Sequence, residues 1–161
     1  MNKRLPDSNA IENVAKVVRT TDFLYLASFA DMVNRFIDII FRKDKINRLR
    51  LGAMNILIAR GGSLMPSQLA RLTFRSKHTI TKVIDSLEKD GFVKRDRSRK
   101  DRRAIRVKIT SAGLDFVMQA LNIGEPLTQQ VMSSLDNDER KILVNLVQRL
   151  RRAMVGIIAS R

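Results

Sequence analysis

Apolar residues recur at helical spacing along most of the chain, and strand-like alternation is confined to a short middle region. Periods of three and four residues predict these helices: 9–20, 22–42, 51–60, 66–72, 76–90, 110–123 and 136–158. Gly124 and Pro126 are expected to interrupt the helix that begins at Thr110, with a short helical stretch after them. Residues 92–95 and 105–109 are predicted as strands, because the second alternates apolar with basic side chains.

Single residues signal the ends of several of these helices. Ser76, Thr110 and Asp136 are each expected to cap the start of a helix, and Asp136 has Glu139 at the spacing of a capping box. Gly61 and Gly62 are expected to end the helix before them, because glycine readily adopts a positive φ.

The order of these elements predicts the fold class, which is mainly α with a small two-stranded β wing. Two helices joined by a short turn and followed by a hairpin form a winged helix-turn-helix, here over residues 46–110. We expect its recognition helix at about 76–90 and its wing at about 92–109. Residues 1–45 and 111–161 add N- and C-terminal helices, which we expect to serve dimerisation.

The predicted recognition helix has one apolar and one polar face. At about 100° per residue, an inward face is formed by Ile80, Val83, Ile84 and Leu87. The DNA-binding candidates lie at the exposed N-terminal end or on the opposite face: Ser76, Lys77, His78, Thr79, Thr81 and Lys82. Their cationic and hydroxyl groups suit phosphates and base edges. A merely solvated amphipathic helix would show the same pattern, so this helix alone does not decide between the two interpretations.

The predicted hairpin is unusually dense in positive charge, with nine basic and two acidic residues between Lys94 and Lys108. These charges repel one another unless phosphates neutralise them, so DNA contact is favoured over a solvated tip. A long arginine at a hairpin tip can enter the minor groove, and a neighbouring aspartate can hold it extended. The wing candidates are Arg97, Arg99, Arg102 and Arg103, with Asp101 as the orienting carboxylate.

The chain as a whole is basic, since 31 Lys and Arg against 16 Asp and Glu give a formal net charge of +15. That excess predicts a polyanionic partner, which can be nucleic acid or an acidic membrane surface. Cysteine is absent and His78 is the single histidine, so we expect neither a metal site nor a cofactor. The apolar runs are far shorter than the roughly 20 residues that span a bilayer. No signal-peptide core follows Lys3 and Arg4, so a cytoplasmic protein with no membrane partner is expected.

Three motifs stand in the region of the predicted helix-turn-helix and wing. They are T-x-T-x-x-x-x-x-L-E-x-x-G from Thr79 to Gly91, D-R-R-A from Asp101 to Ala104, and V-x-I-T-x-x-G from Val107 to Gly113. With the preceding P-S-Q-L-A segment, they closely resemble the MarR family of winged-helix transcriptional regulators over residues 48–115. The resemblance implies that Arg103 enters the minor groove and that Asp101 orients it. It also implies recognition-helix contacts from His78, Thr79, Thr81 and Lys82.

The terminal helices carry two apolar stripes, one from Leu26 to Ile40 and one from Leu143 to Ile157, which exceed what one winged domain can cover. Packing of these helices on each other within one chain is the alternative to association. The resemblance implies a homodimer, whose two recognition helices about 34 Å apart would bind a near-palindromic operator. It also implies a small-molecule effector. Pocket candidates are Phe23, Tyr25, Phe29 and Phe36, with Phe41, although aromatic residues in helices commonly form ordinary core.

We therefore interpret the sequence as a double-stranded DNA-binding transcriptional regulator, acting as a ligand-responsive repressor and a homodimer. One alternative is a winged-helix module for protein–protein interaction, in which the basic wing meets an acidic partner. Another is sequence-neutral nucleic-acid binding. An enzyme is not expected, because the sequence offers neither a phosphate-cradling glycine loop nor paired carboxylates beside a nucleophile.

Overall fold

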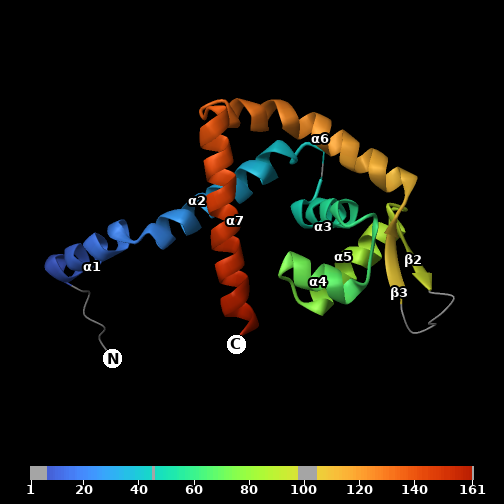
Figure 1. Ribbon diagram of the computed structural model, residues 1–161, viewed down its shortest axis with the longest axis horizontal. Coiled ribbons are helices and arrows are strands. Elements are labelled where there is room, and N and C mark those ends of the chain that lie inside the picture. Colours follow the sequence, from blue (N-terminus) through green and yellow to red (C-terminus); the bar gives the residue numbers. More distant parts are fainter. Residues whose placement is uncertain (1–6, 45, 98–104, 161) are drawn as a thin grey trace. The chain divides into compact units, whose positions relative to one another are not determined.

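The structure, a computed structural model, describes residues 7–44, 46–97 and 105–160. The chain forms two units, Met1–Val117 and Met118–Arg161. The first unit holds the predicted winged helix-turn-helix, and the second holds most of the C-terminal helical region (Figure 1).

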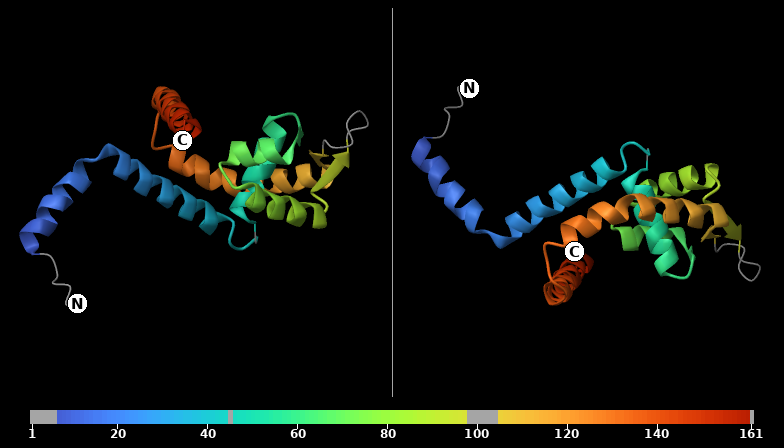
Figure 2. Two further views of the ribbon diagram at one scale, coloured as in Figure 1. Left: turned by 90° about the horizontal axis from the view of Figure 1, so that it is seen from below. Right: turned by 90° about the horizontal axis from the view of Figure 1, so that it is seen from above.

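The winged helix-turn-helix is built from five elements in the predicted order and one short additional strand. Its helices are α3 (Arg48–Ala59), α4 (Pro66–Thr73) and α5 (Lys77–Lys89). The strands β1 (Ser63–Leu64), β2 (Val93–Arg97) and β3 (Ile105–Ile109) form one antiparallel sheet in the order β1-β3-β2. The predicted two-stranded wing is thus extended by β1, which is too short to leave a periodic signal in the sequence. Both views in Figure 2 show β2 and β3 extending past these three helices.

Local side-chain chemistry sets the ends of these helices. The Asn47 side chain accepts hydrogen bonds from the backbone N–H groups of Leu49 and Arg50 and so begins α3. Gly61 and Gly62, at φ 80° and 78°, allow the chain to leave α3 for β1, as predicted. Ser76 caps α5 by accepting from the Thr79 N–H at 3.1 Å, which confirms its predicted role.

The core of this unit lies between α3, α4, α5 and the sheet. The predicted inward residues of α5 are buried, with Ile80, Ile84 and Leu87 fully inaccessible and Val83 at 8% exposure. The core also contains fully buried side chains from α3, α4 and β3: Met54, Leu57, Leu69 and Val107. Because α5 buries one whole face, its polar face must point outward.

The turn after α5 holds the start of α6 (Ser111–Met132) against the winged helix-turn-helix. The Thr110 hydroxyl donates to the Gly91 carbonyl at 2.7 Å and accepts from the Gly113 N–H at 3.1 Å. The rings of Phe92 and Phe116 stack with their centroids 4.5 Å apart. Thr110 therefore caps α6, as predicted, and the same residue fixes the end of α5 to the beginning of α6.

The predicted interruption of α6 at Gly124 and Pro126 is wrong, because α6 continues through both residues to Met132. A proline inside a helix removes one hydrogen bond, to the carbonyl four residues earlier. That carbonyl belongs to Asn122, which is exposed, so water can satisfy it. The structure has no break where the sequence suggested one.

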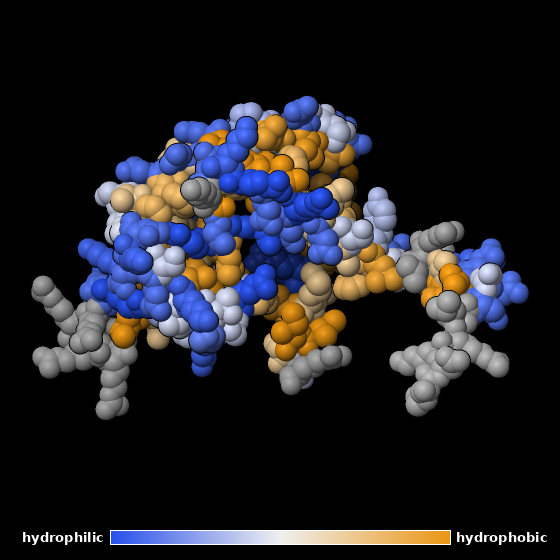
Figure 3. Space-filling view, turned by 180° about the vertical axis from the view of Figure 1, so that it is seen from behind, coloured by the Kyte–Doolittle hydropathy of each residue, from blue (hydrophilic) through white to orange (hydrophobic). Residues whose placement is uncertain are grey.

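The remaining helices are α1 (Ser8–Thr20) and α2 (Asp22–Ile40) in the first unit and α7 (Asn137–Ala159) in the second. A capping box begins α7, since Asp136 accepts from the Glu139 N–H at 2.9 Å and its own N–H donates to the Glu139 side chain. Both α2 and α7 expose apolar side chains, including Phe29 at 48% and Leu146 at 47%. Apolar side chains are open to solvent on the face drawn in Figure 3.

Candidate nucleic-acid interface

The outward face of α5 gathers the sequence-predicted contact residues on one surface. Exposed positions are Ser76, Lys77, His78, Thr81 and Lys82, while Thr79 is half-buried. Their common orientation follows from the burial of the opposite face in the core. The surface presents two lysines, one imidazole and three hydroxyl groups, and these groups can donate to phosphate oxygens and to base edges.

Hydrogen bonds within α5 orient the hydroxyl groups on this surface. The Thr81 hydroxyl donates to the Lys77 carbonyl at 2.9 Å, so its oxygen remains available as an acceptor beside its methyl group. The hydroxyls of Ser76 and Thr79 lie 2.8 Å apart and share one hydrogen bond. The start of α5 is therefore a preorganised polar surface, with side chains already held by the helix.

Several basic residues of the wing strands bind other residues of the same sheet. Lys108 lies 2.5 Å from the Asp96 carboxylate, across the β2–β3 pair. Arg106 donates to the Ser63 hydroxyl at 2.9 Å and to the Ser63 carbonyl at 2.8 Å, which joins β3 to β1. Part of the positive charge that the sequence places in the hairpin thus holds the sheet together.

Arg95, in β2, binds two carboxylates of α5. Its backbone N–H donates to Glu88 at 2.8 Å, its guanidinium donates to Glu88, and its Nη2 lies 2.5 Å from Asp85 Oδ1. The backbone hydrogen bond from Arg95, aided by the guanidinium, lowers the pKa of Glu88. Burial opposes the charge of Arg95, but its hydrogen bonds to Asp85 and Glu88 outweigh this and raise its pKa.

The tip of the wing lies outside the described residues, and most of the predicted wing contacts fall there. These are Arg99, Asp101, Arg102 and Arg103. The backbone of Arg97 is described and pairs with Ile105 at the outer end of β2 and β3. The predicted pairing of Asp101 with a neighbouring arginine stays a prediction.

Two features beside the recognition helix were missed by the sequence analysis. Arg71, in the last turn of α4, and Arg75, in the turn between α4 and α5, are both exposed, and Arg75 adds positive charge directly before the start of α5. Phe74, in that turn, adopts a left-handed backbone at φ 54° and ψ 39° with 49% of its surface exposed. The basic residues could have been found from their position beside the turn, but the left-handed phenylalanine leaves no sequence signal.

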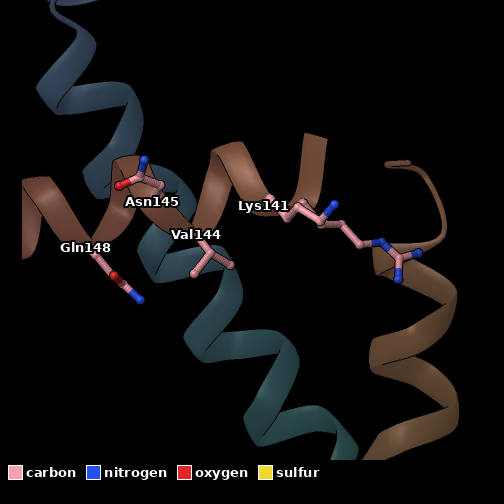
Figure 4. A pocket seen from close by; sticks show the side chains of 5 residues that line it. Lys141, Val144, Asn145 and Gln148 are labelled. Atoms are coloured by element: carbon pink, nitrogen blue, oxygen red, sulfur yellow. The ribbon is translucent and has the colours of Figure 1, made fainter. Parts of the chain in front are cut away.

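Four of the predicted effector-pocket residues lie on α2 but do not share one face, and the fifth, Phe41, follows the helix as its C-cap and is buried. At about 100° per residue, Tyr25, Phe29 and Phe36 fall within about 40° of one another and Phe23 falls on the other side. Tyr25 is 78% exposed and Phe23 is 63% exposed. The hollow in Figure 4 is lined by residues of α7 alone, Arg140, Lys141, Val144, Asn145 and Gln148, so it is an open surface of one helix.

The described residues contain no candidate for a metal site or for a membrane-spanning helix. No group of three or more His, Cys, Asp or Glu side chains there is arranged to hold a metal ion. No helix in the described parts of the chain is long and apolar enough to cross a membrane.

The model of the MarR family matches residues 45–104, which run from just before α3 to the wing tip. Among curated proteins, the HTH-type transcriptional regulator PrsX of Escherichia coli is 31% identical over 87 residues, covering 54% of this chain and 52% of that protein. The transcriptional repressor MprA of Escherichia coli (strain K12) is 30% identical over 88 residues, covering 55% of this chain and 50% of that protein. The matched regions span about half the length of these relatives.

Solved structures of transcriptional regulators share the fold. The organohalide-sensing regulator RdhR, in its 2,4-dichlorophenol-bound form, aligns with a TM-score of 0.70 at 21% identity, covering 96% of this chain and 89% of that one. A mutant MarR from E. coli, in complex with operator DNA, aligns with a TM-score of 0.66 at 22% identity, covering 80% of this chain and 95% of that one.

Proposed function

Because the model of the MarR family matches residues 45–104 and the fold is shared with regulators of that kind, we propose that this chain is a winged-helix regulator of the MarR family, a sequence-specific, double-stranded DNA-binding protein that acts as a repressor. The observation that carries the proposal is the outward face of α5, which is exposed, cationic and rich in hydroxyl groups. A recognition helix of this kind reads the major groove with its N-terminal residues. No catalytic activity is part of the proposal.

The residues of α5 divide by chemistry into two sets. Lys77 and Lys82 suit phosphates, because ammonium groups act there as point charges. His78 and Thr81 suit base edges, with the Thr81 methyl and oxygen offering contact to a thymine methyl or a cytosine or adenine amino group. Ser76 and Thr79 hold the helix start in place. In the wing, we assign phosphate and minor-groove contacts to Arg97, Arg99, Arg102 and Arg103, with Asp101 orienting them.

The protein binds DNA as a homodimer in this proposal, and the terminal helices form the interface. The apolar face of α2 and that of α7 are both open to solvent in the single chain, with Met32 at 61% and Ile157 at 58% exposure. Apolar surface of this extent on a monomer marks an association site. A two-fold dimer requires a near-palindromic operator, with half-sites about 34 Å apart. Light scattering should report twice the 18.4 kDa chain mass, and a monomer at micromolar concentration would refute the dimer.

A small aromatic effector is the proposed signal. Support comes from the shared face of Tyr25, Phe29 and Phe36 on α2, and from the solved neighbour described with 2,4-dichlorophenol. Phe23, also predicted for this pocket, lies on the other side of the helix. An effector can shift DNA binding only by its differential affinity for the two states of the protein.

The decisive experiment is fluorescence anisotropy of the full chain on its own upstream intergenic DNA, against a shuffled duplex of the same composition. Specific binding should be at least about a thousandfold tighter than binding to the shuffled duplex near physiological salt. Equal binding to both duplexes, lost steeply as salt rises, would contradict sequence-specific regulation and favour sequence-neutral binding. A genome-wide pull-down of bound DNA then shows whether any operator exists elsewhere.

Lys82→Ala tests the orientation of α5, with Lys89→Ala as the matched control. Both residues are exposed lysines of α5, but Lys82 lies on the proposed DNA surface and Lys89 ends the helix. We expect Lys82→Ala to weaken binding to all duplexes and to lower the salt slope by about one, since one phosphate contact is lost. Equal effects of the two substitutions would contradict this assignment of the DNA-facing end.

A further inference from the structure

Arg95 links the wing to the recognition helix through interactions of both its backbone and its side chain. The backbone N–H and the guanidinium both bind Glu88, and the guanidinium also binds Asp85. Asp85 and Glu88 lie three residues apart, on neighbouring positions of the α5 surface. The guanidinium of Arg95 is planar and is held by two carboxylates, and the backbone N–H of the same residue is also held. Both the side chain and the backbone of Arg95 are therefore fixed against α5.

Arg95 lies at the point of β2 where the hairpin leaves the hydrophobic core. Arg95 pairs with Val107, which is fully buried, whereas the next pair outward on the same face joins Arg97 to Ile105, which is 37% exposed. The hairpin therefore leaves the hydrophobic core at Arg95. Beyond this residue the direction of β2 and β3 depends on their own pairing and on how they are held at this point.

We propose that Arg95 is a positioning residue, which fixes the direction of the wing relative to α5 without contacting DNA itself. The inference rests on the proposed function. It explains how the wing and the recognition helix are held so that both can contact the same duplex. Arg95 also offsets the charge of the Asp85 carboxylate, which would otherwise repel phosphates from the α5 surface. We call Arg95 with Asp85 and Glu88 the Arg95 clamp.

The Arg95 clamp contributes little to folding, so its variants can be tested as folded proteins. The side chains of Arg95, Glu88 and Asp85 are 29%, 35% and 57% exposed, and ion pairs this exposed stabilise proteins only weakly. The Arg95 clamp can nevertheless contribute to DNA binding, because it fixes the direction of the wing. A wing held in one direction loses less conformational freedom when it meets DNA, and such preorganisation raises affinity.

The test compares Arg95→Met and Arg95→Lys with Lys94→Met, in anisotropy on the native upstream duplex over a range of salt. Lys94→Met removes the same charge from the adjacent, exposed residue of β2 and serves as the control. We expect Arg95→Met to weaken specific binding by about tenfold with the salt slope unchanged, because no phosphate contact is lost. Arg95→Lys should not restore binding, since an ammonium cannot bridge both carboxylates in the same geometry.

A fall in the salt slope by about one for Arg95→Met would overturn the proposal, because it would make Arg95 a phosphate contact. Full rescue by Arg95→Lys would overturn it as well. Hydrogen exchange on the DNA-free protein tests the clamp independently of the proposed function. Residues 93–97 should exchange faster in Arg95→Met than in Lys94→Met. Equal exchange in the two variants would refute the clamp, whereas failure of the wild type to prefer its own duplex would refute only the proposed function.

Discussion

The same substitution, glycine to alanine, should have opposite effects at two helical glycines of this protein. Gly113, in the first turn of α6, approaches the backbone of Phe92 so closely that an added Cβ would lie 2.1 Å from the Phe92 carbonyl oxygen and 2.9 Å from the Ile109 side chain. At the same position on Gly52, inside α3, no atom lies within 4 Å apart from its chain neighbours and the backbone of its own helix. The contrast separates the effect of steric contact from that of helix propensity.

For Gly113→Ala, the obstacle is backbone rather than a flexible side chain. The Phe92 oxygen accepts the Thr110 N–H at 3.1 Å and so cannot move without loss of that hydrogen bond. Overpacking of this kind destabilises by about 1–3 kcal/mol, and we expect the upper end. The higher helix propensity of alanine returns at most about 1 kcal/mol, so the net loss is about 2 kcal/mol. For Gly52→Ala, only the gain of about 0.5–1 kcal/mol remains.

Urea unfolding followed by circular dichroism measures both effects, at equal protein concentration because association adds to apparent stability. With a slope near 2 kcal/mol per molar urea, the midpoint should fall by about 1 M for Gly113→Ala and rise slightly for Gly52→Ala. An unchanged or raised midpoint for Gly113→Ala would show that α6 does not pack against Phe92 as described. The reasoning about this junction would then be refuted.

Two further predictions concern the helix-turn-helix and the Arg95 clamp. Phe74 occupies a left-handed conformation that disfavours side chains, so Phe74→Gly should be about 1 kcal/mol more stable than Phe74→Ala, although both lose the ring. Equal melting temperatures of these two variants would contradict that strain. The lowered pKa of Glu88 contributes stability that is present above its unfolded value near 4.3 and is lost as pH falls through the folded value. The stability difference between wild type and Glu88→Gln should therefore be constant above about pH 5 and shrink below about pH 4, and a difference independent of pH would refute the pairing with Arg95.

The sequence was informative wherever a local pattern determines a local structure. Four apolar residues of α5 at helical spacing predicted its buried face, and Ser76 and Asp136 were recognised as helix caps because their side chains satisfy nearby N–H groups. Gly61 and Gly62 ended α3 as expected. Each of these predictions depends on residues that are close together in the sequence. They can therefore be made without information about tertiary contacts.

The failures occurred where distant residues decide the outcome. The strand β1 has two residues and exists because Ser63 and Leu64 pair with Lys108 and Val107, more than forty positions away. Pro126 was treated as a helix breaker by its local chemistry, yet the exposed surroundings of α6 tolerate it. Periodicity contains no information about pairing over such distances or about solvent access to one carbonyl group.

The charge of the wing shows most clearly what composition cannot decide. Counted along the sequence, every basic residue of the hairpin was available to phosphates. In the structure Arg95 binds Asp85 and Glu88, and Lys108 binds Asp96. Basic residues held in this way release few counterions when DNA binds, because their charge is already balanced. The salt dependence of DNA binding should therefore reflect the α5 surface and the wing tip, and be smaller than the total charge of the hairpin implies.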